Sequence, residues 1–191
     1  MSGIKNQKIK KNVLSNRRGF SLVEVLVTLF VLSIGLVAIS TLMTGNIKSS
    51  ENAKNQIIAS QLAQEGIELV RNLKDNNSTF TGEVSSGADY SIDYTSNYAA
   101  FKSSNNPSDA TKKLYLDTNN FYSNSNSAQA TKFFRKIKIE ITTDASSKKT
   151  ATATSYVTWN NSGFSTISGF PANCTIGNKC LSVVSVMPDL N

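Results

Sequence analysis

A single carboxylate, Glu24, lies in an otherwise apolar run from Phe20 to Met43, and the chain has two cysteines, Cys174 and Cys180. The chain has no histidine, so imidazole can serve neither as a base nor as a metal ligand. Two cysteines alone cannot complete a four-ligand zinc site, and we find no glycine-rich phosphate loop or nucleophile elbow. The sequence therefore predicts no catalytic residue, metal or cofactor, and it favours a structural or interaction protein over an enzyme.

The N-terminal segment has the basic-then-apolar order of an export signal. Residues 1–19 carry six Lys or Arg and no Asp or Glu, so the net charge of +7 leaves only +1 for residues 20–191. The apolar run is about 24 residues long, enough to cross a bilayer core as a helix, and no small-x-small cleavage site follows it. We therefore expect a membrane helix over residues 20–45, with a cytoplasmic N-terminus by the positive-inside rule.

The stretch around the start of this run reads Arg17-Arg18-Gly19-Phe20-Ser21-Leu22-Val23-Glu24. It resembles the prepilin cleavage and methylation motif of type IV pilins and type II secretion pseudopilins, in its basic leader, its Gly-Phe junction, its Glu at the fifth mature position and its apolar stretch. The resemblance implies that a prepilin peptidase removes residues 1–19 by cutting between Gly19 and Phe20, and that Phe20 is N-methylated. A glycine before the scissile bond fits this processing, because it lets the backbone lie extended in a narrow protease cleft.

Glu24 has two interpretations. Ser21 and Glu24 have the spacing of a capping box, in which both side chains satisfy free N–H groups at a helix start. However, a carboxylate at this depth in a membrane costs about 2.5–3.5 kcal/mol unless it finds a partner. Cleavage would create such a partner, the α-ammonium of Phe20 on a neighbouring subunit. With the resemblance, we favour an assembly role for Glu24, and the two roles can coexist.

Residues 46–75 are expected to continue the membrane helix as an amphipathic helix that ends near Lys74–Asn77. Glu65, Glu68 and Arg71 lie in a stretch that resembles the equivalent part of pilin-like proteins, and we interpret them as a solvated helix face rather than as assembly residues. The apolar residues recur mostly at spacings of three or four, and the expected buried stripe consists of Ile47, Ile58, Leu62, Gly66, Leu69 and Leu73, with Ile57 and Val70 alongside.

Residues 76–191 are expected to form a β-rich, extracytoplasmic head domain. Short strands are expected near Tyr90–Tyr94 and on both sides of a turn at 117–120, and a last strand at 181–187. The strongest alternation predicts a hairpin of 135–143 and 150–159, with small Ala151 and Ala153 on its buried face. The predicted fold class is α+β, with a long N-terminal α-helix packed on a small antiparallel sheet.

The hairpin also carries basic residues, and the C-terminal region carries the two cysteines. We interpret the basic cluster as a solvated sheet face whose charges discourage edge pairing, and we do not expect nucleic acid as a partner. Cys174 and Cys180 are expected to form a disulfide, because the predicted topology places them outside the cytoplasm. The basic cluster consists of Lys132, Arg135, Lys136, Lys138, Lys148 and Lys149.

The leading interpretation is a structural subunit, such as a minor pilin, of a type IV pilus or pilus-like filament. Its expected partners are the prepilin peptidase and methylase, other pilin subunits and the inner-membrane assembly machinery. It would start in the cytoplasmic membrane and end in an extracellular pilus or periplasmic pseudopilus. A pseudopilin of a type II secretion or DNA-uptake system shares every N-terminal feature. A single-pass membrane protein with a ligand-binding outer domain is the alternative from another class.

Overall fold

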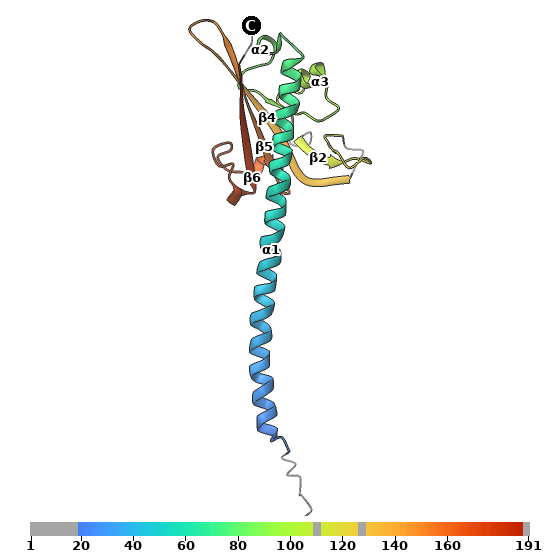
Figure 1. The fold of residues 1–191 in the computed structure, drawn as a ribbon, viewed down its shortest axis with the longest axis vertical. Helices are drawn as coiled ribbons and strands as arrows, with labels where there is room; N and C mark the ends of the chain where they lie inside the picture. Colours follow the sequence, from blue (N-terminus) through green and yellow to red (C-terminus); the bar gives the residue numbers. More distant parts are fainter. Residues whose placement is uncertain (1–18, 109–111, 126–128, 189–191) are drawn as a thin grey trace, which may run out of the picture. The chain divides into compact units, whose positions relative to one another are not determined.

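A long helix, α1 (Leu22–Asp75), contains both the apolar run and the amphipathic segment (Figure 1). The computed structural model describes residues 19–108, 112–125 and 129–188, so the basic leader, except Gly19, lies outside the described residues. The chain divides at Lys48 and Ser49 into an N-terminal unit and a head unit. The helix ends at Asp75, inside the predicted range.

The head unit is built on one fully antiparallel sheet of six strands, in the order β3-β2-β4-β5-β6, with β1 paired to β4. The predicted hairpin is β4 and β5, and the predicted last strand is β6. The α+β architecture expected from the sequence is therefore confirmed. The remaining elements are α2 (Phe80–Glu83), β1 (Asp89–Tyr90), α3 (Tyr98–Ser103), β2 (Lys113–Leu116), β3 (Tyr122–Ser123), β4 (Gln129–Thr143), β5 (Lys149–Thr158), η1 (Gly163–Thr166), η2 (Ile176–Asn178) and β6 (Cys180–Pro188).

Most of the hydrophobic core of the head lies between the 49–75 part of α1 and one face of the sheet, and a smaller cluster around Cys180 lies on the other face. Ala151 and Ala153 are fully buried on the helix-facing side, as their small size predicted, and they share a cluster with Ile67, Val70 and Leu73. A second cluster places Ala59, Leu62 and Ala63 of the helix against Val157 and Trp159. Since the buried hydrophobic residues of the described chain all lie between Ala59 and Met187, residues 49–191 contain the whole of this core.

The predicted apolar stripe of the helix was partly wrong. Ile57 is 61% exposed and Ile47 is also exposed, whereas Ala59, Ala63 and Ile67 are buried. Alanine is a weak hydrophobic signal in a sequence, but a helix that approaches a sheet closely buries small residues at the contact. The buried stripe of the helix is therefore rotated around the helix axis relative to the stripe predicted from the largest apolar side chains.

The region between the helix and the hairpin also differs from its prediction. The strand expected at Tyr90–Tyr94 has only two residues, Asp89 and Tyr90, and Tyr94 is exposed. The structure adds the short helix α3, which the sequence analysis did not predict. Asn97 caps its start by accepting a hydrogen bond from the Ala100 amide at 2.8 Å. That asparagine was the available signal for a helix start.

Gly66 lies at a close contact between the helix and the sheet. A Cβ atom at this position would lie 2.7 Å from Ser155 Oγ and 3.0 Å from Ile137 Cδ1. Ser155 Oγ is buried and, among the described residues, has no hydrogen-bond partner. The close approach therefore depends on glycine in the helix and on a small residue in β5.

Gly66→Ala is expected to lower the free energy of unfolding by about 1–3 kcal/mol, because overpacking outweighs the better helix propensity of alanine. Adding Ser155→Ala should recover much of that loss, because it removes the nearest atom and a buried hydroxyl without a partner. Urea denaturation of the 49–191 fragment measures both. Additive effects of the two substitutions would contradict the proposed contact.

Candidate functional site

The N-terminal unit presents an exposed apolar helix that starts immediately after the predicted cleavage point. Gly19 and Phe20 precede the helix, and the Phe20 side chain is 82% exposed. The first backbone bond of the helix runs from the Val25 amide to the Ser21 carbonyl at 3.2 Å. Glu24 lies in the first turn. Residues 19–48 are exposed throughout, so the described part of this unit has no tertiary core of its own.

The capping box proposed for Ser21 and Glu24 does not form within the described chain. The structure shows the backbone bond from Val25 to Ser21, but it shows no side-chain hydrogen bond of either residue among the described residues. Among the described residues, the Glu24 carboxylate therefore has no hydrogen-bond or ion-pair partner.

Five hydroxyl side chains in or just after the apolar run bond to the backbone of their own helix. Their hydroxyls donate to backbone carbonyls three or four residues earlier, as in Ser33 to Phe30 at 2.7 Å and Ser40 to Leu36 at 2.9 Å. Thr28, Thr41 and Thr44 form the same kind of bond. Such bonding suits a segment in lipid, where no water is present to pair with a hydroxyl. By length and composition, α1 could cross a membrane, with a mean hydropathy of 2.7 over its most apolar 18-residue window.

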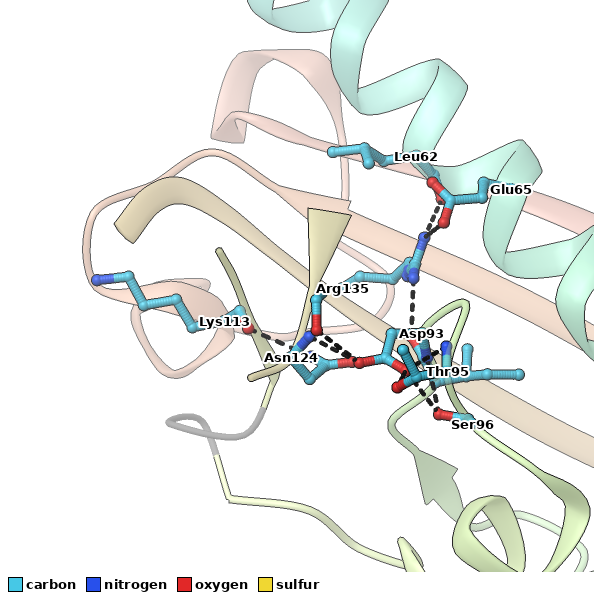
Figure 2. A network of polar contacts seen from close by, with 10 residues as sticks. Leu62, Glu65, Asp93, Thr95, Ser96, Lys113, Asn124 and Arg135 are labelled. Atoms are coloured by element: carbon cyan, nitrogen blue, oxygen red, sulfur yellow. Dashed lines mark hydrogen bonds and ion pairs between the residues drawn. The ribbon is translucent and has the colours of Figure 1, made fainter. Parts of the chain in front are cut away.

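The head unit contains a buried arginine that the sequence analysis assigned to a solvated basic face. Arg135 is only 1% exposed and lies under the helix (Figure 2). It occupies the same face of β4 as Ile137 and Ile139, which are both fully buried. The sequence could have predicted this burial, because alternate residues of a strand lie on the same face, and residues 135, 137 and 139 alternate in β4. Gly66 of the helix leaves room for the aliphatic part of the Arg135 side chain, since a Cβ atom at position 66 would lie only 3.1 Å from Arg135 Cδ.

Arg135 joins three segments of the head. Its Nη1 donates to the Leu62 carbonyl of the helix at 3.1 Å, and its Nη2 donates to the Ile92 carbonyl at 2.7 Å. The Glu65 carboxylate lies 3.4 Å from Nη1. Burial lowers the pKa of the Arg135 guanidinium, and the carboxylates of Glu65 and Asp93 oppose that shift. Glu65 is thus a partner of the buried arginine and not only a solvated charge.

Asp93 anchors the neighbouring loop by accepting several hydrogen bonds (Figure 2). Its carboxylate accepts from Thr95 Oγ1 at 2.7 Å and from the Thr95 amide, Ser96 Oγ, Ser123 Oγ and the Asn124 amide, each at 3.0 Å. Burial by itself would raise the pKa of Asp93, but these donors stabilise the charged form and leave the pKa below its ordinary value. This carboxylate is already well supplied with donors, so it acts as a structural anchor.

The loop between β5 and β6 covers part of the other face of the sheet. Lys136, predicted to be solvated, is buried there, and its Nζ lies 2.6 Å from Asp89 Oδ2 and 4.1 Å from the centre of the Phe170 ring. Lys132 and Lys138 form ion pairs with Glu51 and Glu140. The expectation of a solvated basic face is therefore wrong for Arg135 and Lys136. Alternation along one strand could not predict a loop that folds back over it.

Glu68 and Arg71 form an exposed ion pair three residues apart on the helix, as the solvated-face interpretation expected. Arg71 also donates from Nη2 to Ser185 Oγ at 3.1 Å, so this pair links the helix to β6.

A disulfide joins Cys174 in the covering loop to Cys180 at the start of β6. Cys180 is fully buried among Phe134, Tyr156 and Phe164, and its amide donates to the Thr175 carbonyl at 3.0 Å. The bond therefore ties the covering loop to the sheet, and the expected disulfide is present in the structure.

Exported protein is expected to resist alkylation at both cysteines until a reductant is added. Reduction should lower the free energy of unfolding by about 2–2.5 kcal/mol, because the closed loop is short. Mass spectrometry of alkylated protein, with and without reductant, measures the first effect, and urea denaturation measures the second. Complete labelling without reductant would rule out the disulfide in the exported form.

Comparison with known protein families identifies the N-terminal segment. Residues 14–40 match the prokaryotic N-terminal methylation motif, which is the signature of type IV pilins and pseudopilins. The chain therefore carries that signature at its N-terminus, which supports a type IV pilin-like or pseudopilin protein, and the apolar helix together with the motif supports association with a membrane. The matched residues include Gly19, Phe20 and Glu24 and end within the apolar run. No curated protein and no solved structure matches the chain.

Proposed function

We propose that this chain is a structural subunit of a type IV pilus or pilus-like filament. The observation that carries the proposal is the methylation motif at 14–40 on an exposed apolar helix whose one charge between Phe20 and Met43 is Glu24. An apolar helix without a tertiary partner needs lipid or other helices around it. Membrane insertion before assembly and helix packing after assembly would supply these two environments in turn.

The proposed processing follows from the resemblance at Gly19 and Phe20. A prepilin peptidase on the cytoplasmic face would remove residues 1–19 and N-methylate Phe20. The positively charged leader keeps the N-terminus cytoplasmic, and the head would then lie outside. A disulfide between Cys174 and Cys180 is consistent with that orientation, because disulfides persist in oxidising compartments.

Assembly would pair Glu24 of one subunit with the Phe20 ammonium of a neighbour displaced along the filament axis. Such a contact joins two different surfaces of identical helices, so repeating it generates an open helical filament. The partners are other pilin subunits and the inner-membrane assembly machinery. Recovery of processed chain from an extracellular filament, rather than a periplasmic one, would distinguish a pilus from a secretion pseudopilus.

Gly19→Trp tests the proposal. A bulky residue before the scissile bond should prevent cleavage and leave a membrane-inserted precursor, since the protease cleft requires an extended backbone. Mass spectrometry of the membrane fraction from the native host would show the intact leader in the variant and an N-methylated Phe20 terminus in the wild type. Wild-type filaments that retain residues 1–19 would refute the proposed processing.

A further inference from the structure

The last strand of the sheet, β6, has an unusually open edge. It is terminal in the strand order, and it pairs with β5 over nine consecutive residue pairs, from Thr158 with Cys180 to Thr150 with Pro188. Every second residue of such an edge directs its backbone N–H and C=O groups away from the sheet. Folded proteins normally protect long edges with charges, prolines, bulges or a covering segment.

Within the middle of β6 the strand itself carries none of these protections, and the charged side chain that bonds to it, Arg71 of the helix, reaches the Ser185 hydroxyl and not the backbone. The strand Cys180–Pro188 contains no charged residue, and its proline is the last residue. The covering loop bonds to Cys180 at the start of the strand, but within the described chain no backbone hydrogen bond outside the sheet reaches residues 181–187. On the face away from the helix, Val184 is 58% exposed and Val186 is 62% exposed. A regular, uncharged, β-branched edge of this length is a template for another strand.

From these features we propose that β6 is a docking edge for an extended, uncharged segment of a different polypeptide, which would add a seventh strand to the sheet. The alternating donors and acceptors of the edge match only another extended backbone. Val184 and Val186 would then be covered by β-branched or other apolar side chains of the incoming strand, because cross-strand neighbours on one face pack together.

The direction of β6 argues against a second copy of this chain as the occupant. Leu181 packs against the cluster that contains Ala59 and Leu62. Met187 belongs to the cluster that contains Val70 and Leu73, so β6 and the 49–75 part of the helix run in the same direction. Two copies related by a two-fold axis would pair their β6 edges antiparallel. Parallel pairing is excluded for such a pair, because parallel strands bond with an offset of one residue between them, and a two-fold rotation places identical residues at the same height. Two helices would then point in opposite directions. That arrangement conflicts with the proposed filament, on which this step of the inference rests.

The structure also does not favour a head-to-tail contact, in which β6 of one copy would pair with the opposite edge of the sheet in the next copy. The opposite side of the sheet ends in β1 and β3, which have two residues each. Neither offers an edge comparable in length with β6. A non-identical subunit is therefore the occupant that the geometry supports, and β6 would give this chain a defined neighbour in a mixed filament.

The test uses the full chain in its native host, with the photoreactive residue p-benzoylphenylalanine in place of Val184 or, separately, Val186. We expect both probes to crosslink to one segment of one non-identical subunit, at residues two positions apart, as strand pairing requires. With the probe at position 184, Val186→Lys should reduce the crosslink about tenfold or more, a change of about 1.4 kcal/mol.

Thr152→Lys is the matched control, because Thr152 lies directly opposite Val186 on the same face but in the interior strand β5. It should leave the crosslink largely unchanged.

Crosslinks between two copies of this chain, crosslinks scattered over many proteins, or no crosslink would overturn the proposal. The same samples report cleavage at Gly19. Processed, assembled chain without the crosslink would refute only the docking edge, whereas unprocessed chain would refute the proposed filament function.

Discussion

Glu24→Ala is expected to abolish incorporation into filaments while processed monomer accumulates in the membrane. The substitution removes the one formal charge between Phe20 and Met43, so insertion should become easier by the cost of placing a carboxylate in lipid. Gly19 and Phe20 are unchanged, so cleavage and methylation should continue. The neighbouring Phe20 ammonium would lose its partner in an apolar environment, at a cost of about 3–5 kcal/mol for each added subunit. Immunoblotting of membrane and filament fractions measures the distribution.

Glu24→Gln separates the charge from the shape of the side chain. Glutamine can cap a helix but cannot neutralise an ammonium, so this variant should also fail to assemble. If Glu24 served only as a cap, Glu24→Ala would cost about 0.5–2 kcal/mol of helix stability and Glu24→Gln would cost little. Normal incorporation of cleaved Glu24→Gln protein into filaments would therefore disprove the charge pair.

Arg135→Ala is expected to lower the free energy of unfolding of the head by about 3–5 kcal/mol. The substitution removes the donor that binds the Leu62 carbonyl at 3.1 Å and the Ile92 carbonyl at 2.7 Å. It also leaves a cavity beside Gly66 and removes the cation that faces Glu65. Urea denaturation of the 49–191 fragment measures the change, and a loss large enough to unfold the fragment would appear in its far-UV circular dichroism.

Lys132→Ala provides the matched control, because Lys132 belongs to the same strand but pairs with Glu51 at the surface. Its loss should cost less than about 1 kcal/mol. Arg135→Lys should recover only part of the stability, since an ammonium cannot reach two carbonyls in the forked geometry of guanidinium. A cost for Arg135→Ala similar to that of Lys132→Ala would show that the buried network does not stabilise the head.

The sequence by itself determined the elements whose signals are local. The basic leader, the Gly-Phe junction, Glu24 and the apolar run are adjacent in the chain, and the matched motif at 14–40 confirms the signature they form. The β4–β5 hairpin and β6 were also predictable, because alternation of side chains is a property of each strand alone. Ala151 and Ala153 revealed the helix-facing side of the sheet for the same reason.

Only the tertiary structure decided what lies opposite each face. Arg135 and Lys136 are neighbours in one strand and were predicted to be solvated, yet one is buried under the helix and the other under the covering loop. The burial of Ala59 and Ala63, the contact of Gly66 with Ser155 and the open edge of β6 depend on packing between segments far apart in the chain. The physical reason is that burial and edge exposure depend on which element covers a residue, and periodicity within one element carries no information about its neighbour.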